Sequence, residues 1–190
     1  MAESGLDSLT ETHAIALTWK AYELRPPEAP AQSPAELERF RAYLREGWPR
    51  LADIARERFG LVIQPPPFRP GMHTRLAHVA TKVAEALGQG DAFHRAVFRA
   101  YWLEGREIGA EAVLVEIAQA VGLEADAFRA GLADDQYRYA VAADAQWAYQ
   151  AGLQGVPAFI FGERYLVSGA QPVEVLRQVA DRCRAEGRTL

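Results

Sequence analysis

The chain has 190 residues, which is enough for one domain or for one domain with a large insertion. Hydrophobic residues make up 49% and charged residues 24%, as in an ordinary globular protein, and the net charge of −4 argues against a nucleic-acid platform, which usually carries a basic stripe. The sequence contains no run of about 20 apolar residues, so no membrane span is predicted.

Cysteine content and the N-terminal residues bear on the compartment. Cys183 is the single cysteine, so an internal disulfide and any Cys-x-x-Cys motif are excluded. The first residues lack the basic and apolar regions of a secretory signal. We therefore expect a reduced, cytoplasmic setting.

The N-terminal quarter predicts a helix end followed by a strand. Residues 2–9 have the pattern of a frayed helix end and a loop. Apolar and polar residues alternate over residues 13–24, which is the period of a half-buried strand. Pro26 and Pro27 end this pattern, and a loop rich in proline and alanine extends to Gln32.

The middle of the chain predicts a series of helices. Ser33, Pro34 and Glu36 together form a helix-start signature, and Pro49 predicts a kink or break in the helix that follows. Further apolar stripes predict helices at about 73–87, 91–104, 110–121, 125–132 and 136–151. Most of these have a glycine at the end, where a left-handed C-cap is expected, at Gly88, Gly105, Gly122, Gly131 and Gly152.

The C-terminal stretch 155–172 predicts a hairpin and a closing helix. Two short apolar runs flank a turn at residues 162–164. Pro172 is placed to open an amphipathic helix whose buried face is formed by Val173, Leu176, Val179 and Ala180. The chain thus offers three strands for about six helices, and its first strand has no obvious neighbour, which suggests that an upstream element is missing.

Five segments of the chain match a known family in order and at family-like spacing. They are residues 19–26 (WKAYELRP), 74–78 (TRLAH), 100–108 (AYWLEGREI), 155–159 (GVPAF) and 167–172 (VSGAQP). With them the chain resembles the DsbA-family thioredoxin-like proteins, in particular the FrnE-like subgroup, which is related to the 2-hydroxychromene-2-carboxylate isomerases. The resemblance implies an α/β fold: a thioredoxin-like, DsbA-type sheet with a large all-helical insertion. The implied thioredoxin-like domain covers residues 1–32 and 152–190, and the insertion covers residues 33–151.

The chain departs from this family at its N-terminal end. Such proteins begin with a strand and then carry a Cys-x-x-Cys at the start of the next helix, and neither is present here. We therefore expect that the N-terminal β-α unit is truncated, either by loss or because the sequence starts late in a longer reading frame. An exposed sheet edge would be prone to aggregation, and a homodimer contact could cover it.

The resemblance also implies a ligand groove. It makes Val156–Pro157 a cis peptide bond whose Val156 backbone is free to pair with an extended thiol-containing peptide or with glutathione, whereas the sequence alone favours a plain trans proline that starts a strand. Ser168, Gly169 and Gln171 precede a helix N-terminus that could hold an anion such as the γ-glutamyl end of glutathione, or they are simply a helix cap. The resemblance further places Thr74 and His78 over the groove, and the alternative is a capping threonine with a half-buried structural histidine.

Other chemistry has little support in the sequence. The four histidines form no metal-binding pattern with an acid or cysteine, so no metal site is predicted. Cys183 is far from the groove in sequence and is not expected to be catalytic. The family function is thiol–disulfide exchange, but without a dithiol this chain is expected to be inactive in redox chemistry by itself. The alternatives are a glutathione-dependent isomerase or transferase, and a non-catalytic module for peptide binding or dimerisation.

Overall fold

The computed structural model describes residues 2–29, 33–63, 65 and 73–189. The chain forms two compact units. We call the first the hairpin unit; it comprises Met1–Trp19, Pro49–Val62 and Ala151–Leu190. The second, the helical unit, comprises Lys20–Trp48 and Ile63–Gln150. The domain division predicted from the sequence, at 32/33 and 151/152, stays a prediction.

The hairpin unit contains the predicted hairpin. Strand β1 (Ala158–Phe161) pairs antiparallel with β2 (Tyr165–Ser168), and Phe161 lies opposite Tyr165 in the register. Gly162 and Glu163 both have positive φ, 53° and 56°, which matches the backbone twist that a tight hairpin requires. The turn signal in the sequence therefore predicted the hairpin correctly.

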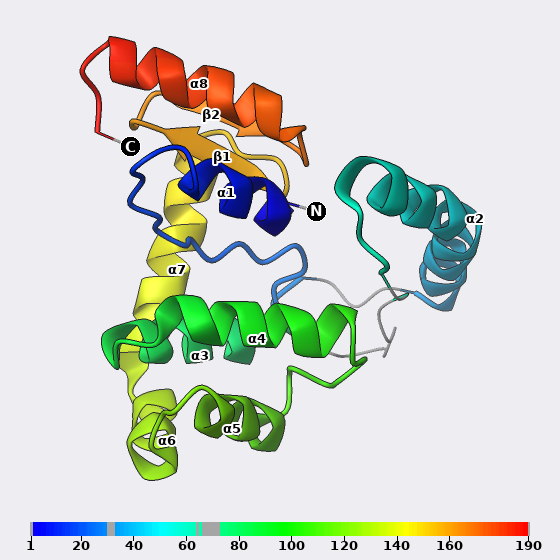
Figure 1. Ribbon diagram of the computed structural model, residues 1–190. Helices are drawn as coiled ribbons and strands as arrows, with labels where there is room; N and C mark the ends of the chain where they lie inside the picture. The colour runs from blue at the N-terminus through cyan, green and yellow to red at the C-terminus, as the bar shows by residue number, and fades with distance from the viewer. Residues whose placement is uncertain (1, 30–32, 64, 66–72, 190) are drawn as a thin grey trace. The chain divides into compact units, whose positions relative to one another are not determined.

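Two helices complete the core of the hairpin unit (Figure 1). Helix α1 (Ala2–Thr10) packs against α8 (Val173–Ala185), and α8 also contacts β1. Burial of apolar surface from all of these elements stabilises the unit. The shared core comprises Leu9, Phe161, Val167, Leu176, Ala180 and Cys183.

Helix α2 (Pro34–Phe59) begins where its capping residues predict. The Ser33 N–H donates to the Glu36 carboxylate at 2.8 Å, and the Glu36 N–H donates in return to Ser33 Oγ at 3.3 Å. This reciprocal pair satisfies backbone donors that a helix start otherwise leaves unpaired. Pro49 lies inside the helix, which continues beyond it.

The helical unit is built around α3 (Arg75–Ala86), which contacts each of the following helices in the unit. Val79 and Val83 of α3 belong to the same buried core as Phe93 and Phe128, whose ring centroids lie 5.3 Å apart. The other helices are α4 (Gly90–Trp102), α5 (Glu111–Ala120), α6 (Ala125–Ala133) and α7 (Asp135–Gln150). All five helices lie where the apolar periodicity predicted them.

The glycines confirm four of the five predicted helix ends. Gly88, Gly105, Gly122 and Gly152 have positive φ just beyond a helix. The prediction for Gly131 was wrong, because α6 continues past it to Ala133. A Cβ at Gly131 would lie 2.5 Å from Val83 Cγ1, so this glycine allows α6 to pack closely on α3.

The strand predicted at residues 13–24 was also wrong. Residues 14–23 form neither helix nor strand, and the sheet seen in the described residues has only β1 and β2. A strand needs a neighbour for its backbone groups, and an alternating pattern by itself cannot supply one. Hydrogen bonds to side chains of helices α3 and α7 hold residues 20–28 instead.

Among the helices that the structure describes, none is long and apolar enough to cross a bilayer.

Candidate ligand-binding site

The segment that leads into β1 borders a hollow in the hairpin unit. The hollow has a volume of about 390 Å³. The Gly169 N–H donates to the Pro157 carbonyl at 2.8 Å, which continues the pairing of Ala158 with Ser168 beyond the ends of the strands. This contact holds the segment before β1 beside the segment after β2. The lining residues are Gly152, Leu153, Gln154, Gly155, Val156, Pro157, Leu166, Ser168 and Gly169.

Val156 lines the hollow, and both its exposure and its backbone bear on binding. The residue is 50% exposed, and the Val156–Pro157 peptide bond is cis. Among the described residues, no hydrogen bond engages the N–H or the C=O of Val156. Backbone groups of this kind are what an added extended strand uses for pairing.

The corner after β2 contains the predicted residues Ser168, Gly169 and Gln171. Ser168 and Gly169 line the hollow, and Gly169 has a φ of 78°. Gln171 instead turns back, so that its Nε2 donates to the Ser168 carbonyl at 2.9 Å. Pro172 is the N-cap of α8 and has no side-chain capping bond. The structure thus brings four of the predicted residues together: Val156, Pro157, Ser168 and Gly169.

Thr74 and His78 belong to the helical unit. Thr74 is the N-cap of α3, and its carbonyl accepts the His78 N–H at 3.2 Å, but its side chain makes no capping bond. Burial lowers the pKa of His78, and Lys82 adds to this, while Glu23 and Asp144 act in the opposite direction. The ring is therefore uncharged at neutral pH. A ligand contact by either residue stays a prediction.

A buried carboxylate in the helical unit was missed at the sequence level. Asp144 of α7 is 5% exposed and lies between Lys20 and Lys82, each with its Nζ 2.9 Å from a carboxylate oxygen. It also accepts the Ala21 N–H at 3.0 Å. Asp144 lies three residues after Val141 and four before Ala148, both buried. An acid on the apolar face of a helix was the signal that could have revealed it.

Cys183 is completely buried in the core of the hairpin unit. Over the part of the chain that the structure describes, there is no group of three or more histidine, cysteine, aspartate or glutamate side chains that could hold a metal ion.

Comparison with known proteins identifies the family. Residues 1–180 match the family model of the DSBA-like thioredoxin domain. The chain belongs to this family. The predicted thioredoxin-like, DsbA-type fold is therefore confirmed, and it is mostly helical with a small hairpin sheet.

Individual relatives extend this result. A probable DsbA oxidoreductase from Streptomyces coelicolor is 27% identical, with a TM-score of 0.81, and the match covers 100% of this chain and 85% of that one. An uncharacterized Bacillus subtilis protein, YwbO, is 27% identical over 157 residues, which is 82% of this chain and 76% of YwbO. A 2-hydroxychromene-2-carboxylate isomerase is 19% identical with a TM-score of 0.71, over 98% of this chain and 90% of that one, and it shows a shared fold alone.

Proposed function

We propose that this DSBA-like protein binds an extended thiol-containing peptide or glutathione in the hollow beside Val156, and that it has no thiol–disulfide turnover of its own. The observation that carries the proposal is the backbone of Val156, whose N–H and C=O are unengaged among the described residues at the edge of the hollow. An extended ligand could pair with both groups as an added strand does.

Family membership supports a thiol as the ligand. The chain shares the DSBA-like domain over residues 1–180, and its Streptomyces relative is named a probable DsbA oxidoreductase. Ser168 and Gly169 add a polar end to the hollow, just before the N-terminus of α8, where a negative charge is favoured. This end suits the γ-glutamyl carboxylate of glutathione and is the reason to keep glutathione beside peptides as a ligand.

The burial of Cys183 supports the absence of turnover. Thiol–disulfide exchange requires a thiolate that can reach the sulfur of its partner. Cys183 is 0% exposed and lies among Phe161, Val167 and Leu176 in the core. No other cysteine is present in the sequence to act as nucleophile or resolving thiol.

The binding half of the proposal can be tested with two variants at one position. We expect calorimetric titration with S-methylglutathione, which cannot exchange disulfides, to show binding in the wild type. Val156→Ala retains the backbone N–H, so its affinity should stay near that of the wild type. Val156→Pro removes this donor, which should cost about 1–2 kcal/mol, or about fivefold to thirtyfold in affinity. Equal affinities for V156A and V156P, or no heat with the wild type, would refute backbone recognition, provided that circular dichroism shows both variants folded.

The redox half has a separate assay. In insulin reduction with dithiothreitol we expect the wild type to match the uncatalysed rate. Cys183 should react with a thiol reagent in denaturant and remain protected in the native protein, because it is buried. Turnover that disappears in Cys183→Ser would contradict the claim that the protein lacks exchange activity, and it would leave the binding result unaffected.

A further inference from the structure

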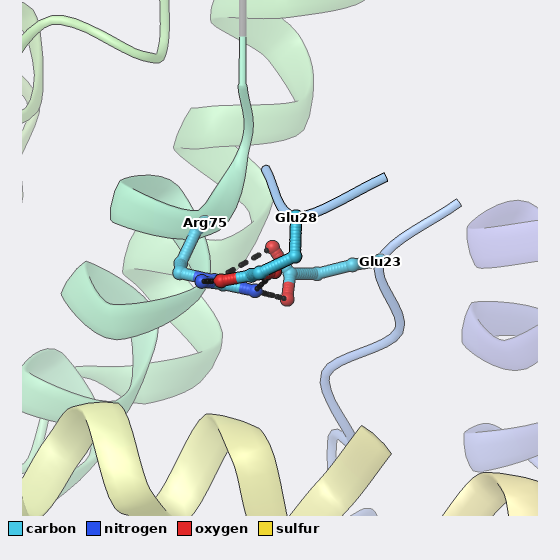
Figure 2. A network of polar contacts seen from close by, with 3 residues as sticks. All are labelled: Glu23, Glu28 and Arg75. Carbon is cyan, nitrogen blue, oxygen red and sulfur yellow. Dashed lines mark hydrogen bonds and ion pairs between the residues drawn. The ribbon is translucent and has the colours of Figure 1, made fainter. Parts of the chain in front are cut away.

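Arg75 holds two carboxylates at the start of α3 (Figure 2). Its Nε lies 3.1 Å from both oxygens of Glu23, and its Nη2 lies 2.9 Å from Glu23 Oε2. The other edge of the guanidinium faces Glu28, with Nη2 2.7 Å from Oε2 and a second bond from Nη1 to Oε1. Both edges of the guanidinium are thus engaged by carboxylates of the segment 23–28, and all three residues belong to the helical unit.

The place of Arg75 in its helix makes this region attractive to anions. It is the first residue of α3, where the unpaired N–H groups already contribute a partial positive charge. The first turn of α3 contains no acidic residue, and the Thr74 side chain makes no capping bond. Within the described residues, the carboxylates that contact Arg75 at this helix end are those of Glu23 and Glu28.

The two carboxylates differ greatly in exposure. The Glu23 side chain is 8% exposed, whereas that of Glu28 is 67% exposed. Glu28 lies in a turn that is closed by a hydrogen bond, in which the Ala29 N–H donates to the Pro26 carbonyl at 2.9 Å. Glu23 is consequently a fixed partner of Arg75, while the Glu28 carboxylate can leave into water at little cost, as exposed ion pairs do.

We propose that the Glu28-facing edge of Arg75 is a carboxylate-binding site, which Glu28 occupies within the chain and which the carboxylate of a small acid or of a peptide C-terminus takes by exchange. A planar guanidinium matches a planar carboxylate through two parallel hydrogen bonds, so the geometry that Glu28 adopts is the one a soluble carboxylate would copy. Glu28 is ionised at neutral pH, since the hydrogen bond from Arg75 lowers the pKa of its carboxyl below the ordinary 4.5. Exchange at neutral pH thus replaces one ionised carboxylate by another without proton uptake. This inference is independent of the hollow beside Val156.

The test is an NMR titration that follows the Arg75 Nε–H signal in the full chain. Sodium acetate serves as the small acid, and N-acetyl-dialanine serves as a peptide C-terminus, with its C-terminal amide as the form that lacks the charge. We expect Glu28→Gln to tighten acetate binding at Arg75 by up to about fivefold, the ratio expected when one competing exposed ion pair is removed. A larger gain for the peptide acid than for acetate would assign the site to peptide ends, and equal gains would assign it to carboxylates in general.

A matched control exists in the same unit. The Arg106–Glu116 pair has nearly the same exposure, 31% and 66%, as the 32% and 67% of Arg75 and Glu28, but Arg106 is not at a helix start. Glu116→Gln should leave the titration at Arg75 unchanged and should produce weaker acetate binding at Arg106. The proposal is overturned if E28Q does not tighten binding, if the amide competes as well as the acid, or if Arg106 in E116Q binds as tightly as Arg75 in E28Q.

Discussion

The buried Asp144 carboxylate offers the sharpest test of the helical unit. Asp144→Ala removes a side chain that is 7% exposed and that joins the segment at residues 20–21 to helices α3 and α7. Three interactions are lost together: those with Lys20 Nζ, with Lys82 Nζ and with the Ala21 N–H.

The expected loss of stability follows from the exposure of each partner. The Lys20 side chain is 46% exposed, so its pair contributes little. Lys82 is 13% exposed and loses its ion pair with Asp144 while keeping the one with Glu85, and the buried Ala21 N–H loses its acceptor. Breaking a buried pair typically costs about 3–5 kcal/mol, and we expect D144A to lower the free energy of unfolding by this amount. Asp144→Asn keeps one acceptor oxygen and should cost roughly half as much.

The pH dependence supplies a second readout. Burial by itself raises the pKa of Asp144, but the hydrogen bonds from Lys20, the Ala21 N–H and Lys82 outweigh it, so the pKa lies below its usual 3.8. A carboxylate with a lowered pKa stabilises the folded state above its unfolded pKa, and this stabilisation is lost as the pH falls below it. The difference between wild type and D144N should therefore be full at pH 6 and should shrink below a pH of about 4.

Urea denaturation followed by circular dichroism measures these differences, with Asp135→Asn as the control. Asp135 begins the same helix, pairs with Arg138 and is 73% exposed, so D135N should cost less than about 1 kcal/mol. A loss below about 1 kcal/mol for D144A, or equal losses for D144A and D135N, would refute the inference that the buried Asp144 carboxylate stabilises the contact of residues 20–21 with helices α3 and α7.

Two further predictions concern packing and acid sensitivity. Gly131→Ala should destabilise the protein, because the new Cβ would lie 2.5 Å from Val83 Cγ1, although alanine favours helices over glycine by up to about 1 kcal/mol. Gly47→Ala is the control, because nothing lies within 4 Å of its Cβ, and it should be neutral or stabilising. Thermal denaturation measures both effects. Burial lowers the pKa of His94 to about 4 from 6.5, so the folded state favours the neutral ring, and the free energy of unfolding should fall by roughly 2–3 kcal/mol as the pH drops from 6.5 to 4. His94→Phe should lack this decrease, and an unchanged acid profile in H94F would contradict it.

Features encoded over a few neighbouring residues were predictable from the sequence. The capping pair of Ser33 and Glu36, the turn at Gly162 and Glu163, and the helix that follows Pro172 all appear where their local signals lie. The same holds for part of the candidate site, because Val156 and Pro157 are joined to Ser168 and Gly169 by the register of one short hairpin.

Features that depend on a distant partner were not predictable. The alternation at residues 13–24 indicated a strand, but no neighbouring strand pairs with it in the described chain, and side chains hold its end instead. Gly131 followed the pattern of a helix end, although its small size serves a contact with Val83 of another helix.

The sequence by itself thus determined most of the helices and the hairpin, since hydrophobic period, caps and turns act within one or two turns of the chain, and five segments that resemble DsbA-like proteins indicated the family. Only the tertiary structure decided which charges meet. Asp144 lies 123 residues from the Ala21 N–H that it accepts, and Arg75 lies 52 residues from Glu23. Periodicity along one segment contains no information about a carboxylate on another, so these pairs exist only once packing has excluded water from around them.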